Sequence, residues 1–137
     1  MLYGIAILAH SWLRWGVLLA MLGRLGLAIA DRSSGRAYEK RARIASAVTV
    51  GLLDLTLVLG VVLLSWLSPL TTSAMADMGS AMSDPLRRFW LVEHPTMMFL
   101  ASVVAHVGTA IAKRAEPRRA HTMVILGLSL AKGPFGF

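Results

Sequence analysis

The sequence predicts an all-α integral membrane protein, an up-down bundle of about four transmembrane helices of which the fourth is short. The hydrophobic fraction is 56% and the mean hydropathy is +0.66. A soluble domain of 137 residues has too small a core to bury that much apolar surface. Long apolar runs alternate with short gaps that hold basic residues, as membrane topology requires. Because backbone groups inside lipid must bond within their own segment, each run is expected to be a helix.

Three runs are long enough to cross a bilayer, which takes about 20 residues for a hydrocarbon layer about 30 Å thick. They cover residues 2–30, 44–67 and 89–112. The first run is interpreted as a span and not as a signal peptide, since it has no basic start and contains Arg14 and Arg24. All three therefore belong to the predicted bundle.

The fourth predicted helix, residues 121–132, is shorter than the others. Its apolar stretch rises only about 15 Å, and Gly133-Pro134 directly after it stops a helix. We expect a short span followed by an extended tail. The whole chain, residues 1–137, is then a single transmembrane domain.

The basic residues predict the orientation of the bundle. The net charge is +7, but the basic side chains lie between spans, so nucleic acid is not an expected partner. Loops 31–43 and 113–120 are the most basic, which predicts that they face the cytoplasm and the N-terminus faces the periplasm. The chain has no cysteine, which excludes disulfides and thiolate metal sites.

The longest gap, residues 68–85, would lie on the periplasmic side. Met75, Met78 and Met82 are spaced there by three and four residues, as on one face of an amphipathic helix. Flexible methionine side chains make adaptable contact surfaces, so this segment is expected to rest on the membrane or on a partner. Binding of Cu(I) by the thioethers is the alternative.

Ionisable side chains inside a span cost about 2.5–3.5 kcal/mol each, so each needs a partner or a function. His10 and Arg14 lie one turn apart on one face of the first helix. Asp54 on the antiparallel second helix reaches a similar depth. We expect a buried Arg14–Asp54 ion pair, which either locks two helices together or takes part in moving protons or other charges.

His94 begins the third helix at nearly the depth of His10, because the rise is about 1.5 Å per residue. Two imidazoles on diagonal helices can ligate haem b from its two faces, with Arg14 near a propionate. In the alternative structural network, His10 bonds to Glu93 and His94 caps its helix. A third reading places a metal such as zinc on His10, Glu93 and His94.

His106 points about 120° away from the His94 face of the third helix. It is level with His121 at the start of the fourth helix. A second metal or haem site on this pair is the weaker candidate. The alternative is that His106 packs beside Gly108 and His121 lies at the interface.

The chain resembles a group of small bacterial four-helix membrane proteins whose members are sometimes labelled cytochrome b-like. The shared motifs include His10-Ser11-Trp12-Leu13-Arg14-Trp15, Leu53-Asp54-Leu55, Ser68-Pro69-Leu70, Met82 through Trp90, Glu93-His94-Pro95 and Ala105-His106-Val107-Gly108. The resemblance implies a common polar centre and a place in the bacterial inner membrane. It is lost at the chain's end, where the group has a longer fourth helix.

These observations lead to three functional expectations. The first is an accessory or structural subunit of a larger membrane complex of electron transport, which contacts lipid and other subunits or forms a homo-oligomer. The second is a haem b-binding electron-transfer protein with His10 and His94 as axial ligands. The third is a component of a proton or ion pathway. No catalytic constellation is present, so enzymatic activity is not expected.

Overall fold

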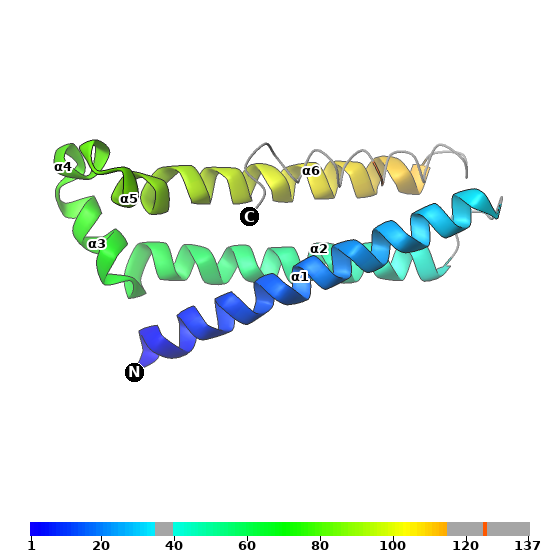
Figure 1. Ribbon diagram of the computed structural model, residues 1–137, viewed down its shortest axis with the longest axis horizontal. Coiled ribbons are helices and arrows are strands. Elements are labelled where there is room, and N and C mark those ends of the chain that lie inside the picture. Colours follow the sequence, from blue (N-terminus) through cyan, green and yellow to red (C-terminus); the bar gives the residue numbers. More distant parts are fainter. Residues whose placement is uncertain (35–39, 115–124, 126–137) are drawn as a thin grey trace.

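The computed structural model describes residues 1–34, 40–114 and Ile125, and every regular element within them is a helix. Three long helices, α1 (Leu2–Ser33), α2 (Lys40–Val62) and α6 (His94–Arg114), run along the long axis of the molecule (Figure 1). Short helices connect α2 to α6 at the end where the N-terminus lies. We call this the capped end and the opposite one the basic end.

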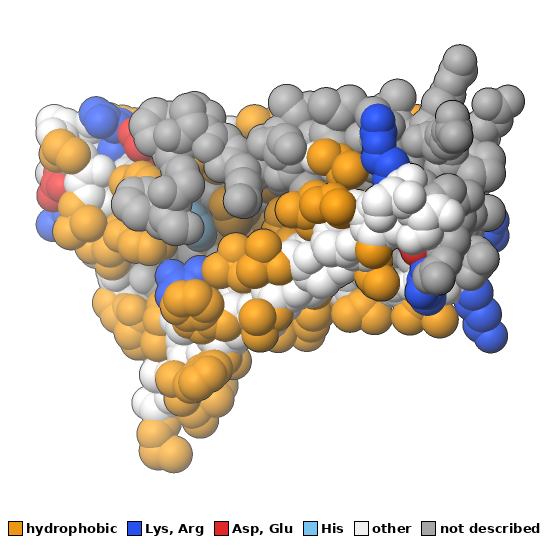
Figure 2. All heavy atoms as spheres, turned by 45° about the vertical axis from the view of Figure 1, so that its right-hand side comes forward, with side chains coloured by type: hydrophobic (Ala, Val, Ile, Leu, Met, Phe, Trp, Pro, Cys, Tyr) orange, Lys and Arg blue, Asp and Glu red, His pale blue; other side chains and the backbone are white. Residues whose placement is uncertain are grey.

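Three segments are long and apolar enough to cross a membrane: Leu2–Ser33, Lys40–Leu67 and Pro85–Arg114. Only 11%, 11% and 17% of their most apolar windows are buried within the chain. Hydrophobic side chains accordingly cover much of the described surface on the face that Figure 2 shows. The three predicted apolar runs are confirmed as helices long enough to span a membrane, and each is longer than predicted. The predicted fourth helix at residues 121–132 lies outside the described residues except for Ile125.

Small and hydroxyl side chains line the contact between α1 and α2. Ala42 and Ser46 of α2 are buried, Thr49 is 2% exposed and Ala6 of α1 is 7% exposed. Ala28 of α1 packs instead against Ala112 of α6. The Thr49 hydroxyl donates to the Ala45 carbonyl at 2.8 Å and lies 3.3 Å from the Ala20 carbonyl of α1. Small residues let membrane helices approach closely, because lipid gives no hydrophobic drive for helix association.

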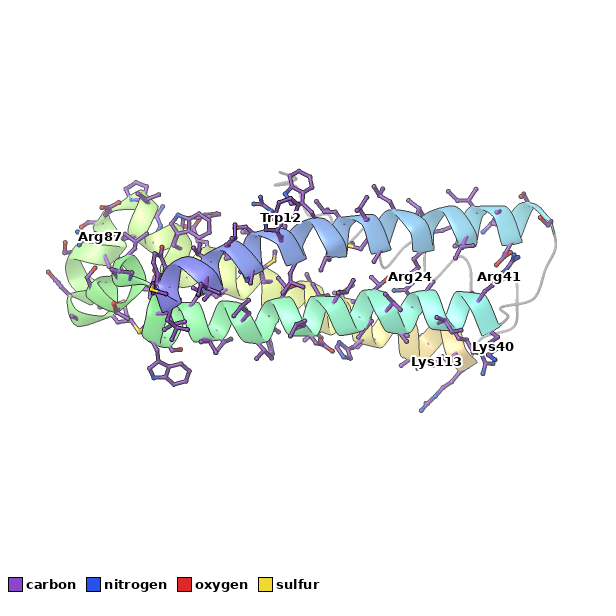
Figure 3. All side chains as sticks on the ribbon, turned by 90° about the horizontal axis from the view of Figure 1, so that it is seen from below. Trp12, Arg24, Lys40, Arg41, Arg87 and Lys113 are labelled. Carbon is purple, nitrogen blue, oxygen red and sulfur yellow. The ribbon has the colours of Figure 1, made fainter. Side chains whose placement is uncertain are left out.

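The basic end is fastened by buried polar contacts. Asp31 is fully buried in α1 and forms an ion pair with Arg41 of α2. Arg24 of α1 reaches α6 and donates to the Thr109 hydroxyl at 3.0 Å. Figure 3 shows Arg24 and Arg41 between the long helices, with Lys40 and Lys113 at the same end. These contacts join all three long helices.

The capped end contains α3 (Pro69–Ala76), α4 (Met78–Ser83) and α5 (Pro85–Arg88). Each begins at a polar side chain that caps it: Ser68, Asp77 and Asp84. The predicted single methionine helix is therefore wrong, because the Asp77 cap starts a second helix. Met82 packs against a buried cluster of Ala74, Ala81 and Leu91, whereas Met75 and Met78 are 40% and 49% exposed.

Widened turns lead into and out of the capped end. Segments η1 (Leu63–Leu67) and η2 (Phe89–Glu93) are π-helical. In η2 the His94 N–H bonds to the Phe89 carbonyl, five residues back. Pro95 explains this, because proline has no N–H and its ring clashes with the carbonyl four residues before it. Such single π-turns are frequent at functional sites.

The Asp31–Arg41 pair yields a stability prediction. Arg41→Gln should lower the free energy of unfolding by about 2 kcal/mol, since it leaves a buried carboxylate without its cation. Thermal unfolding of the purified protein in detergent measures this change. Arg43→Gln is the matched control, because Arg43 is exposed at the same end and should change stability by less than about 0.5 kcal/mol. Equal losses in both variants would contradict the assignment.

Candidate functional site

The two histidines predicted to share a level do meet. The ring centroids of His10 in α1 and His94 at the start of α6 are 6.5 Å apart, with the ring planes at 77°. The predicted convergence of these side chains from different spans is therefore present. It forms the first polar centre of the bundle.

The sequence around each histidine explains why the rings can approach. A Cβ atom on Gly60 of α2 would lie 3.1 Å from Cε1 of His10, so the absence of a side chain there makes room for the ring. His94 packs against Trp90 and Phe89, with centroid distances of 5.2 and 6.0 Å. Both aromatic residues belong to η2, so the widened turn before Pro95 also shapes the His94 side of the centre.

The distance between the two imidazole rings is close to that of two histidine ligands on one metal ion. His10 Nδ1 is buried and has no hydrogen-bond partner, which is unfavourable unless another group takes it up. With metal–nitrogen bonds of about 2 Å, two imidazoles on one ion place their centroids roughly 6 Å apart. The observed separation is close to that value. The residues present are thus compatible with a group that both histidines ligate.

Glu93 does not join this pair. Its carboxylate accepts from Arg88 Nε at 2.8 Å and is 45% exposed. Among the described residues, no three His, Cys, Asp or Glu side chains are close enough to hold a metal ion together. Neither the predicted His10–Glu93 bond nor the three-ligand site with Glu93 is formed, because Arg88 precedes Glu93 by just over one turn and binds its carboxylate locally.

The predicted Arg14–Asp54 ion pair is also not formed. The Arg14 side chain is exposed, and its guanidinium carbon lies 5.5 Å from the centre of the Trp15 ring. Within residues 1–34 and 40–114 it has no acidic partner. Equal depth did not bring the two groups together, because Asp54 faces α6 and not α1. The predicted buried network of Arg14, Asp54 and Glu93 is therefore three separate sites.

Asp54 forms a second polar centre with α6. Its Oδ2 atom lies 3.3 Å from His106 Nε2, and its Oδ1 accepts from the Ser102 hydroxyl at 3.2 Å. The Asp54 and His106 side chains are 43% and 52% exposed. They open onto a groove of about 530 Å³ between α2 and α6. The groove is lined by Ala47, Val50, Gly51, Asp54, His106, Thr109, Ala110, Lys113 and Arg114.

The proposed partner of His106, His121, lies outside the described residues, so their predicted site is untested. Sequence reasoning assigned no role to Ser102, Arg24 or Asp31 as site residues. One signal could have found Ser102, which stands four residues before His106 and so on the same face of α6. Arg24 and Asp31 were visible as charges in the first apolar run, but their partners on other helices were not.

No family model, curated protein or solved structure matches the chain. The resemblance to small bacterial four-helix membrane proteins therefore depends on the motifs alone. The two polar centres lie within those motifs, which supply His10, His94, Asp54 and His106.

The glycine beside His10 gives a direct test of the first centre. Gly60→Ala should displace the His10 ring by a few tenths of an ångström, which NMR shifts of the His10 imidazole would register. Gly51→Ala is the control in the same helix, since a Cβ there meets nothing within 4 Å. Alanine is favoured over glycine in helices by about 1 kcal/mol, so Gly51→Ala should be the more stable variant. Identical His10 shifts in both would contradict the packing described.

Proposed function

We propose that the chain is an accessory subunit of a larger membrane complex of electron transport, and that it docks through the face of α1 that carries Arg14. Arg14 follows the first residue of α1 by twelve positions, which is about 18 Å along the helix. It is exposed and has no acidic partner within the described ranges. This is the observation that carries the proposal.

An arginine at that depth is costly if it faces only hydrocarbon, by about 2.5–3.5 kcal/mol on insertion scales. The cost falls when another molecule supplies an anionic or carbonyl acceptor. Trp12 and Trp15 flank Arg14 and are 69% and 55% exposed, and Trp12 points away from α2 (Figure 3). Tryptophan and arginine are the residues enriched at the centres of protein interfaces.

The membrane and the orientation follow the distribution of charge. Lys40, Arg41, Arg43, Lys113 and Arg114 lie at one end of the long helices. We place this basic end in the cytoplasm and the capped end in the periplasm of a bacterial inner membrane. Arg36, Arg118 and Arg119, which belong to the same predicted loops, lie outside the described residues. A homo-oligomer is one form that the larger complex can take.

A second candidate function is binding of haem b, which the His10–His94 geometry favours. The two imidazoles would hold the iron, and the cradle at Gly60 would keep His10 in position. Bound haem would supply one-electron transfer, with a potential set by its two axial ligands and their surroundings. Arg14, one turn from His10, could pair with a propionate. Both candidates thus give the Arg14 guanidinium an acceptor that residues 1–34 and 40–114 do not supply.

The accessory role predicts that Arg14 is needed for assembly. When the chain is purified from its native membrane in mild detergent, other subunits or further copies should co-purify with it. Arg14→Gln should reduce their yield by about tenfold or more, which corresponds to about 1.4 kcal/mol or more of binding free energy. Arg43→Gln removes a charge at the basic end and should leave the yield unchanged. A chain that always runs alone would contradict an accessory role.

The haem candidate is tested by absorption spectra of the purified protein, oxidised and dithionite-reduced. A Soret band with sharp reduced α and β bands is expected, and His10→Ala or His94→Ala should abolish it. His106→Ala is the matched control, since it removes an imidazole from the other centre. A featureless visible spectrum from intact complexes would end the haem candidate without affecting the accessory role.

A further inference from the structure

The second polar centre carries an inference of its own, independent of docking or haem. Its position is unusual for charged groups. Asp54 stands fourteen residues from the first residue of α2, near the middle of the Lys40–Leu67 span, and His106 stands eight residues before the end of α6. Both side chains are about half exposed on the groove between the two helices.

The hydrogen-bond partners of His106 indicate which of its ring nitrogens carry a proton. Nδ1 lies 3.0 Å from the Ser102 carbonyl oxygen. A carbonyl oxygen only accepts, so in the tautomer that makes this bond Nδ1 carries a proton. In the other tautomer Nδ1 is an acceptor for the Ser102 hydroxyl, which lies 3.5 Å away. In the first tautomer Nε2 of a neutral imidazole would be an acceptor, yet it lies 3.3 Å from Asp54 Oδ2. Two acceptors repel each other, so in that tautomer the contact requires one more proton between them.

The net charge of the Asp54–His106 pair depends on this extra proton. With it, the pair is neutral overall, either as imidazolium with carboxylate or as imidazole with carboxylic acid. Without it, the pair carries one negative charge. The Ser102 hydroxyl already bonds to Oδ1 and so fixes the carboxylate toward His106.

Polar groups continue from this pair toward the basic end. Ser102, His106, Thr109 and Lys113 follow each other on α6 at intervals of four, three and four residues, which keeps them on one face. Thr109 accepts from Arg24 of α1, and Lys113 and Arg114 end the groove. Within the described ranges, Lys113 and Arg114 are the other charged side chains that line the groove with Asp54 and His106, and Arg24 meets this face of α6 through Thr109.

We infer that the α2–α6 groove is a water-filled entry from the basic end, and that Asp54 and His106 form a proton-binding site at its inner end. A groove of about 530 Å³ has room for roughly 18 waters, each needing about 30 Å³. Water satisfies the half-exposed side chains in a way that lipid does not. A proton reaches the pair along the groove and leaves by the same route.

The first test uses the absence of native cysteine. Gly51→Cys places a thiol in the groove, and Val48→Cys places one on α2 outside it, nearer the basic end and 50% exposed. A membrane-impermeant thiosulfonate reagent, applied from the basic-end side of proteoliposomes, should modify Gly51→Cys at least about tenfold faster, because thiolates form in water. Arg43→Cys marks that side. Equal rates, or faster labelling from the other side, would overturn the water-filled entry.

The second test observes the proton itself. In lipid nanodiscs at neutral pH, a low-field proton resonance coupled to His106 Nε2 is expected from the shared proton. Asp54→Asn should abolish it, while Glu93→Gln, which removes a carboxylate at the capped end, should retain it. A variant's fold is checked by the Gly51→Cys labelling rate in the same background. The same Nε2 signal with and without the Asp54 carboxylate would overturn the proton-binding site.

Discussion

A polar side chain inside a hydrocarbon layer needs a polar partner, and this requirement organises the contacts between α1, α2 and α6. Asp31 is satisfied by Arg41, Arg24 donates to Thr109, and Asp54 meets Ser102 and His106. Each of these contacts joins two different helices. Since lipid offers no hydrophobic drive for association, such contacts and close packing of small residues hold the spans together. Among the described residues, Arg14 has no acidic partner and the buried His10 Nδ1 has no hydrogen-bond partner, so both groups are exceptions to this rule.

The two polar centres divide the bundle by depth. His10, His94 and the aromatic residues of η2 lie toward the capped end, where backbone turns are irregular. Asp54, His106 and Ser102 lie further toward the basic end, on regular helix. The haem candidate concerns the first centre, and the proposed proton-binding site concerns the second. Neither depends on the other for its geometry.

Sequence reasoning predicted depth well and direction around the helix poorly. The three spans and the shared level of His10 and His94 follow from apolar run length and a rise of about 1.5 Å per residue. The prediction of an Arg14–Asp54 ion pair was wrong because Asp54 lies on a different face of α2 from the one that meets α1. Asp54 precedes Gly60 by six residues, so it lies about 120° around α2 from the glycine that faces His10. Without knowledge of which face of α2 meets α1, depth alone could not choose the partner of Asp54.

The break at Asp77 could not be predicted from the methionine spacing, because that spacing alone is typical of one continuous helix. The break depends on a single capping side chain, that of Asp77.

The widened turn at Phe89–Glu93 has a consequence for how related chains can differ. A π-turn holds one more residue than the α-turn that it replaces. The turn before Pro95 is therefore equivalent to an α-helix with one residue inserted. Deleting one residue there would convert the segment to ordinary helix. Everything on the capped side would then rotate by about 100° relative to the rest of α6. The one extra residue of the π-turn thus sets the angle about the α6 axis between the aromatic neighbours of His94 and the His106 side chain.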